Sequence, residues 1–171
     1  MKVTIVAMFL LIAAALPTAE SCQPCPIFWV PYLGNCYRIF AETLTWTAAE
    51  NKCQSFTTWI AKGHLVSIRS KEENEFVSRL WNSATDGLVT REPYATYWIG
   101  LTDARYEGTW RWSDTNQLAT YTNWDRNQPD NHSGNQDCVT VWNRSGLQTI
   151  WDDKQCNAVQ GYVCKLPQNN Y

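Results

Sequence analysis

Seven cysteines in a chain of 171 residues constrain the fold more than any other feature of the sequence. They stand at positions 22, 25, 36, 53, 138, 156 and 164. Six of them can pair in fifteen ways, and the spacing alone does not choose among these pairings. Because disulfides persist in oxidising compartments, the count favours an extracellular domain held by bridges, with one cysteine left over.

The first 21 residues are typical of a secretory signal peptide. Lys2 supplies the positive charge, residues 3–15 are apolar and small residues follow, so we expect cleavage at about residues 19–21. No later apolar run approaches the roughly 20 residues that a membrane-spanning helix needs. We therefore expect a secreted protein without a membrane anchor, in which residues 22–171 form one domain.

The charge of the chain argues against nucleic acid as a partner. Fourteen Lys and Arg residues face sixteen Asp and Glu residues, which gives a formal net charge of −2, and the sequence holds no basic run. A protein that binds the phosphate backbone normally carries a strongly basic patch. The same absence argues against binding to an anionic membrane surface.

The apolar pattern predicts an α+β domain with two helices. Thr45 is a candidate cap for a helix that runs to about residue 56, with Trp46 and Cys53 on one face. Ser70-Lys71-Glu72-Glu73 is a capping-box pattern that opens a second helix. Residues 139–142, 149–151 and 161–165 are predicted to close a small antiparallel sheet. The tryptophans expected in the core are Trp29, Trp46, Trp98, Trp110 and Trp112.

Two polar segments carry the candidate site. Residues 128–138 read Gln-Pro-Asp-Asn-His-Ser-Gly-Asn-Gln-Asp-Cys, and residues 151–156 read Trp-Asp-Asp-Lys-Gln-Cys. Together they hold four aspartates and several amide oxygens. Hard oxygen ligands of this kind suit calcium. The chain has only two histidines, His64 and His132, which argues against a histidine-rich zinc or copper site.

At these residues the chain resembles the C-type lectin family. The matching motifs are Gln128-Pro129-Asp130, Gln136-Asp137-Cys138, Trp151-Asp152-Asp153 and Trp98-Ile99-Gly100-Leu101, and the match runs from Cys25 to Lys165. The resemblance implies a C-type lectin-like domain, with two helices, small antiparallel sheets and a long calcium-binding loop region. It also implies the disulfides Cys25–Cys36, Cys53–Cys164 and Cys138–Cys156.

The resemblance further implies a calcium-dependent sugar site. The principal calcium ligands would be Gln128, Asp130, Gln136, Asp152 and Asp153, and the peptide bond before Pro129 would be cis. An accessory calcium site would use Asp103, Glu107, Asn131 and Asp137. Asn131 stands where the family commonly has aspartate, so this second site is expected to be weak. Exposed acids on a turn are the alternative interpretation of the accessory residues.

The sugar would bind at Gln128, Asp130, Gln136 and Asp152, with His132 beside them. In the family, Gln-Pro-Asp goes with galactose-type sugars, so galactose or N-acetylgalactosamine is expected. Gln136 and Asp152, however, stand where the family usually has Glu and Asn. This second reversal restores the relative order of acid and amide that accompanies mannose-type sugars, which are the alternative.

His132 occupies a position where galactose-binding members often have a tryptophan that packs on the sugar. Imidazole covers less apolar area than indole, so His132 is either a stacking group or a plain surface histidine. Asn131 and Asn143 each begin an N-x-S glycosylation sequon. Asn143 is the better candidate, because Asn131 lies in the tight loop of the site.

Cys22 is left over near the expected mature N-terminus. An odd cysteine in a secreted protein suggests a bridge between chains, so we expect a disulfide-linked homodimer. A free or capped thiol is the alternative. The implied function is a secreted, agglutinating or innate-defence lectin, and a lectin-like domain that recognises protein is the alternative. We expect no enzyme, because carboxylates that bind calcium stay ionised and leave no general acid.

Overall fold

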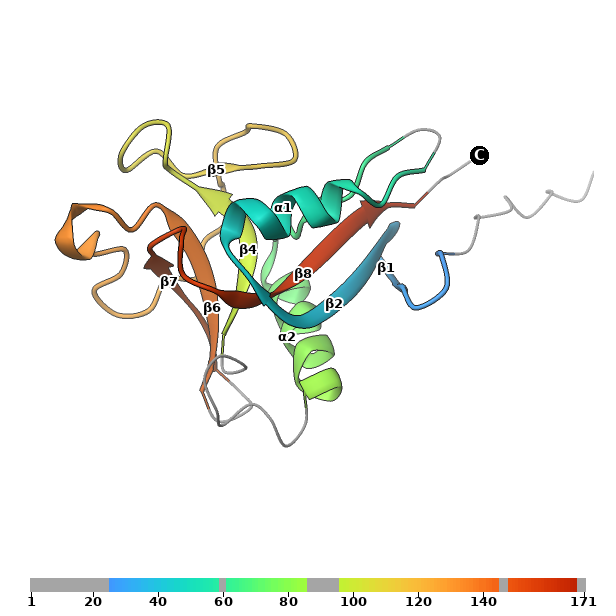
Figure 1. The fold of residues 1–171 in the computed structure, drawn as a ribbon. Helices are drawn as coiled ribbons and strands as arrows, with labels where there is room; N and C mark the ends of the chain where they lie inside the picture. Colours follow the sequence, from blue (N-terminus) through green and yellow to red (C-terminus); the bar gives the residue numbers. More distant parts are fainter. Residues whose placement is uncertain (1–24, 59–60, 86–95, 145–147, 169–171) are drawn as a thin grey trace, which may run out of the picture.

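The computed structural model describes residues 25–58, 61–85, 96–144 and 148–168, and Figure 1 shows their arrangement. Within these residues eight strands form one sheet, in the spatial order β1-β2-β8-β4-β6-β7, with β3 added to β8 and β5 added to β4. The strands are β1 (Val30–Tyr32), β2 (Asn35–Leu44), β3 (His64–Leu65), β4 (Thr96–Thr102), β5 (Arg111–Trp112), β6 (Cys138–Arg144), β7 (Gln148–Lys154) and β8 (Gln160–Pro167). With two helices, this sheet confirms the α+β class.

The beginning and the end of the domain lie side by side. Strand β2 pairs antiparallel with β8, and β8 runs parallel to β4. Strands β6 and β7 form an antiparallel hairpin, as expected. The expectation that residues 161–165 pair with this hairpin was wrong, because β8 lies between β2 and β4. Residues 160–164 are buried without interruption, which is typical of a central strand that is covered on both faces.

Helix α1 (Trp46–Gln54) begins where the sequence predicts. Thr45 has an extended backbone, and its hydroxyl accepts a hydrogen bond from the Ala48 amide at 3.4 Å. Such a cap stabilises a helix by about 0.5–2 kcal/mol relative to alanine. The helix ends two residues before the expected limit, and Cys53 on its buried face is tied to the sheet.

Helix α2 (Lys71–Thr85) opens with a capping pair, as the sequence predicts. The Ser70 hydroxyl accepts a bond from the Glu73 amide at 3.2 Å, and the Glu73 carboxylate accepts one from the Arg69 amide at 2.8 Å. In the usual capping box the glutamate reaches the amide of the capping residue itself. Here it reaches one residue further. The other carboxylate oxygen accepts the Tyr37 hydroxyl at 2.6 Å, so one side chain joins α2 to β2.

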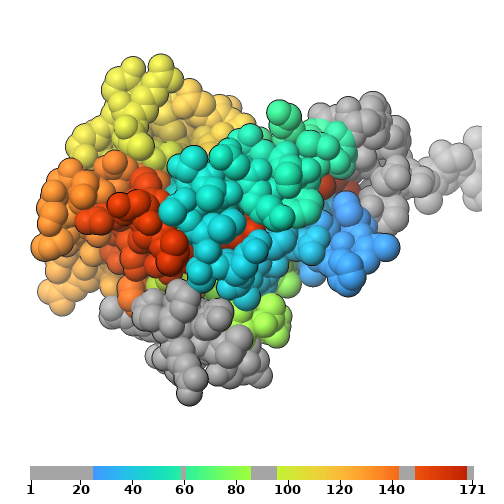
Figure 2. Space-filling model, viewed as in Figure 1, coloured from blue at the N-terminus to red at the C-terminus, as the bar shows by residue number. Residues whose placement is uncertain are grey.

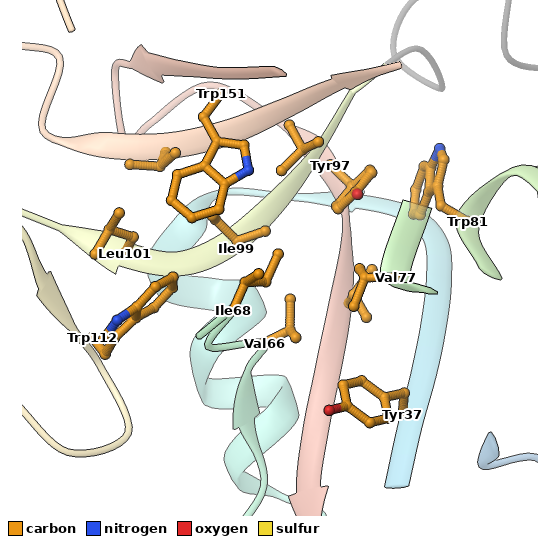
Figure 3. Packing of buried hydrophobic residues seen from close by; sticks show 13 residues of the cluster. Tyr37, Val66, Ile68, Val77, Trp81, Tyr97, Ile99, Leu101, Trp112 and Trp151 are labelled. Carbon is orange, nitrogen blue, oxygen red and sulfur yellow. The ribbon is translucent and has the colours of Figure 1, made fainter. Parts of the chain in front are cut away.

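The core is rich in aromatic rings (Figure 3). Its larger cluster packs α2 against the sheet, and a smaller cluster lies under α1. Of the five tryptophans expected in the core, Trp29, Trp98 and Trp112 are buried, whereas Trp46 and Trp110 are half-buried at its margin. Two further tryptophans, Trp81 and Trp151, are fully buried at its centre.

Three disulfides have the pairing that the resemblance implied: Cys25–Cys36, Cys53–Cys164 and Cys138–Cys156. The second ties α1 to β8 across 111 residues. In the chain-entropy account, closing a loop of that length stabilises a protein by about 4–5 kcal/mol. The third joins the start of β6 to the segment after β7, so it fixes the base of the loop that carries the candidate site.

Candidate functional site

The loop that precedes β6 holds the first group of candidate ligands. Its Gln128–Pro129 peptide bond is cis, as expected. Before this bond the Gln128 amide donates to the Asp125 carbonyl at 3.1 Å, and after it a short helical turn spans His132–Gly134. Figure 1 shows the loop in orange, at one end of the domain beside the β6–β7 hairpin.

Asp153, on β7, holds this loop against the sheet. The residue is fully buried. One carboxylate oxygen accepts the backbone amide of Asp130 at 3.1 Å, and the other accepts that of Asn131 at 2.7 Å. An ionised acceptor makes such bonds stronger than neutral pairs. The carboxylate therefore fixes the backbone that follows Pro129.

Gln136 fastens the loop from its other end. Its Oε1 accepts the His132 amide at 2.6 Å, and its Nε2 donates to the Asp153 carbonyl at 3.0 Å. Its own amide donates to Asn131 Oδ1 at 3.0 Å. Both ends of the loop thus meet at the same residue of β7.

Asp152 is the third acid of the predicted principal set. The Trp142 indole donates to Asp152 Oδ2 at 2.9 Å. Burial raises the pKa of the Asp152 carboxyl; the bond from Trp142 opposes this rise, and the charges of Asp153 and Asp130 add to it. The charges of Asp153 and Asp130 act on Asp152 because the three carboxylates lie close together. The structure thus brings Asp130 near two acids that follow it by 22 and 23 residues in the sequence.

The chemistry of these residues fits a calcium ion. Among the described residues, no three His, Cys, Asp or Glu side chains are arranged as a metal-binding cluster. The predicted principal set consists instead of two glutamines and three aspartates. Gln128 Oε1 is buried and has no hydrogen-bond partner within the described structure. Such an oxygen costs about 1–3 kcal/mol, and a cation would satisfy it. All five residues offer oxygen, which calcium prefers.

The predicted accessory residues lie partly together. Asp103 is buried, and burial raises the pKa of its carboxyl; the nearby charges of Glu107 and Asp137 raise it further, against a bond from the Gly108 amide at 2.8 Å. Its Oδ1 is buried without a partner in the described residues. The amide oxygen of Asn131 serves the principal loop, as described above. Asp103, Glu107 and Asp137 therefore lie near one another. Asn131 does not join them, because its side-chain oxygen accepts the Gln136 amide.

The remaining predicted residues lie at the margin of the site or outside the described chain. His132 is exposed in the helical turn. Asn143 belongs to β6 by its backbone, and its side chain is outside the described structure. Residues 1–21 and Cys22 also lie outside it. Within the described residues, no helix has the length and apolar character to cross a membrane.

Trp142 lies beside the candidate site and is not among the site residues predicted from the sequence. The ring is half-buried and its N–H is bonded to Asp152. The register of the β6–β7 hairpin would have indicated this contact, because it sets Thr140 opposite Asp152. Two residues further along the same face, Trp142 is the diagonal neighbour of Asp152, a distance that a long side chain spans.

Comparison with known proteins decides the family. The model of the lectin C-type domain matches residues 42–166, which is well over half of the chain. The chain belongs to the C-type lectin family. This family is built on a carbohydrate-binding, non-enzymatic domain, so the expectation that the chain is not an enzyme is confirmed.

This C-type lectin has relatives that are named for different sugars. It is 38% identical to the alpha-N-acetylgalactosamine-specific lectin of Patiria pectinifera, over 89% of this chain and 91% of that one. It is 36% identical to the C-type lectin mannose-binding isoform of Oxyuranus scutellatus, over 94% and 95%. The solved C-type lectin CEL-I from Cucumaria echinata superposes with a TM-score of 0.74 at 31% identity, over 85% and 99%. Membership therefore establishes carbohydrate binding and leaves the sugar open.

Proposed function

We propose that this C-type lectin is a secreted protein that binds galactose or N-acetylgalactosamine through calcium, at residues 128–137 and β7. The observation that carries the proposal is the double contact of the Asp153 carboxylate with the backbone amides of Asp130 and Asn131. This contact brings the Gln-Pro-Asp turn next to the two acids of β7. The ligands implied by the family resemblance are thereby gathered at one end of the domain.

Calcium would be held by Gln128, Asp130, Gln136, Asp152 and Asp153. The bound ion would supply a positive charge that two neighbouring sugar hydroxyls can coordinate. The amides donate to these hydroxyls and the carboxylates accept from them. Each hydrogen bond to a charged group is worth about 1.5–3 kcal/mol. A second ion at the predicted accessory residues would support the loop from the side of Asp103.

The order of amides and acids favours galactose-type sugars at the first pair, Gln128 and Asp130. The relative named for N-acetylgalactosamine supports this choice. Mannose-type sugars are the second candidate, because Gln136 and Asp152 reverse the second pair as well. The relative named for mannose binding supports that candidate. His132 is exposed at the loop and would cover the apolar face of a bound sugar.

Retention on immobilised sugars in calcium, followed by competitive elution, tests the proposal. We expect elution by galactose or N-acetylgalactosamine and by EDTA. Elution by mannose and not by galactose would select the second candidate, and the double variant Gln136→Glu/Asp152→Asn should then move the preference toward galactose. Retention that persists in EDTA would overturn the calcium site.

A glycan array with and without EDTA widens the test. Asp130→Ala should lose binding, whereas the control Asp125→Ala, which removes an acid of the same loop outside the ligand set, should keep it. A folded protein that binds no glycan on the array in calcium would indicate that the domain recognises protein instead.

Assembly and modification complete the proposal. Cys22 would link two copies, and the resulting pair would agglutinate cells or microbes because it carries two sites. Joining two weak sites raises the avidity by about 10²–10⁴ when both engage. Asn143 would carry the N-linked glycan. Non-reducing electrophoresis should show the dimer, and Cys22→Ser should convert it to monomer.

A further inference from the structure

Exposed apolar side chains gather at the N-terminal hairpin. Seven large hydrophobic residues are exposed in the described structure, and four of them fall between positions 27 and 33. These four, which we call the N-terminal apolar face, are Ile27 at 80%, Phe28 at 80%, Val30 at 37% and Leu33 at 72% exposure. Single exposed apolar residues are common, but four within seven positions indicate an interaction surface.

Two residues of this face hold backbone conformations that bulky residues avoid. Phe28 has φ 71° and Leu33 has φ 44°, both in the left-handed region. Leu33 and Gly34 form the two-residue turn between β1 and β2, where asparagine followed by glycine is the favoured pair. A bulky residue there is unfavourable by about 1–3 kcal/mol. Burial within the chain does not offset this cost, because both side chains are exposed. Such a local mismatch points to a role outside the chain.

The exposed Phe28 ring is held in place and borders a groove. The Arg38 guanidinium lies over the ring, 5.6 Å from its centroid. A groove of about 320 Å³ runs between the hairpin and the end of α2, and its lining includes Phe28, Val30, Leu80 and Ala84. A fixed aromatic ring beside an apolar groove is the arrangement of an anchor residue and a receiving pocket at an interface.

The proposed bridge at Cys22 favours a second copy of the chain as the partner of this face. The other six cysteines are paired within the chain. Cys22 precedes Cys25 by three residues, which span at most about 10 Å. If two copies are joined at Cys22, their Cys25 residues lie no more than about 25 Å apart. The apolar face of the second copy is then within reach of that of the first.

We propose that the N-terminal apolar face is the contact between two copies of this chain, which pack about a two-fold axis beside the Cys22 bridge. The inference rests on the proposed bridge for its tether and is independent of sugar binding. Pro31, in the middle of β1, has no amide proton, so the contact is made by side chains and does not extend the sheet. A tether keeps the effective concentration near the millimolar range, at which a small face suffices.

The position of this face suits a lectin with two sites. In Figures 1 and 2 the N-terminal hairpin, in blue, lies on the opposite side of the domain from the orange loop of residues 128–137. Two copies joined at the hairpins would therefore present their loops at opposite ends. Neither loop would be covered by the contact.

Two double variants test the contact. Ile27→Ser/Phe28→Ser removes the largest part of the face, and Leu118→Ser/Val159→Ser removes two exposed apolar residues elsewhere, at 54% and 51% exposure. Each is compared with the wild type and with Cys22→Ser by non-reducing electrophoresis, light scattering and amide hydrogen exchange of residues 28–32. Sugar retention reports separately whether each variant is folded and active.

We expect the wild-type dimer to exchange these amides at least tenfold more slowly than Cys22→Ser. Ile27→Ser/Phe28→Ser should keep the bridge and lose the protection, while Leu118→Ser/Val159→Ser should keep both. A bridged wild type that exchanges as fast as Cys22→Ser would overturn the contact. If the wild type has no bridge, the contact stands only if light scattering shows reversible dimers that the Ile27/Phe28 variant abolishes.

Discussion

Replacing Asp153 by alanine should remove the contact of its carboxylate with the loop backbone and also the calcium contact proposed for it. The buried side chain accepts the amides of Asp130 at 3.1 Å and Asn131 at 2.7 Å. Its removal leaves both donors without their charged acceptor, and each such bond is worth about 1.5–3 kcal/mol. The free energy of unfolding in EDTA should therefore fall by at least about 3 kcal/mol, the lower limit for the two bonds together. In a chain of this size that loss lowers Tm by roughly 6–12 °C.

Asp130→Ala is the matched variant, because it removes a proposed ligand without a buried contact. Asp130 is exposed, and its carboxylate accepts an exposed bond from the His132 amide at 3.1 Å. Its loss should change the stability in EDTA by less than about 1 kcal/mol. Calcium at a hundred times its Kd should stabilise the wild type by about 2.7 kcal/mol. Both variants should lose that gain, together with sugar retention.

Urea unfolding followed by tryptophan fluorescence, in EDTA and in calcium, measures both effects. If Asp153→Ala is as stable as the wild type in EDTA, the hydrogen-bond reasoning is refuted. If either variant gains as much stability from calcium as the wild type does, that residue is not a calcium ligand.

Three further outcomes are expected. The bond with Glu50 raises the pKa of His64 above its ordinary 6.5. The stabilisation by this pair is therefore present below pH 6.5 and lost as the pH rises through the folded pKa. His64→Gln should flatten the fall of Tm above pH 6.5, and an unchanged slope would count against the pair. Gly161→Ala sets a Cβ against the Trp81 ring and should lower the free energy of unfolding by about 1–3 kcal/mol, seen as a shifted urea midpoint. Enzymatic removal of N-glycans should reduce the mass of the secreted protein, and a mass shift that survives in Asn143→Gln would place the glycan elsewhere.

The features that could be predicted from the sequence are those that neighbouring residues determine. Thr45 and Ser70 cap their helices because a hydroxyl reaches amides two or three residues away. The β6–β7 hairpin follows from alternating residues on either side of a short connection. The disulfide pairing, in contrast, came from the family resemblance, since the spacing of the cysteines left every pairing open.

Contacts between distant segments could not be predicted. The place of β8 between β2 and β4 depends on pairs that are distant in the sequence, such as Asn35 with Pro167 and Tyr97 with Gly161. The apolar run of β8 is compatible with several sheets. Trp81 of α2 and Trp151 of β7 are fully buried in one cluster because the helix packs against the sheet, which is a contact between distant segments. At the site, the residue types were predicted, but the role of Asp153 as the anchor of the loop backbone depends on how the loop lies on β7.

The unusual residues at positions 136 and 152 are physically linked. Gln136 accepts the His132 amide with one side-chain atom and donates to the Asp153 carbonyl with the other, so it closes the loop by its own hydrogen bonds. A glutamate at position 136 could not donate to that carbonyl and would set a negative charge against it. An acid at position 152 then restores the negative charge of the proposed calcium ligand set, and there the Trp142 indole satisfies one of its oxygens. The exchange thus keeps three carboxylates in the proposed ligand set, and the amide of residue 136 is bonded to the Asp153 carbonyl. Under the proposed function, sugar choice depends on where the amides and acids stand, and the competitive elution measures that choice directly.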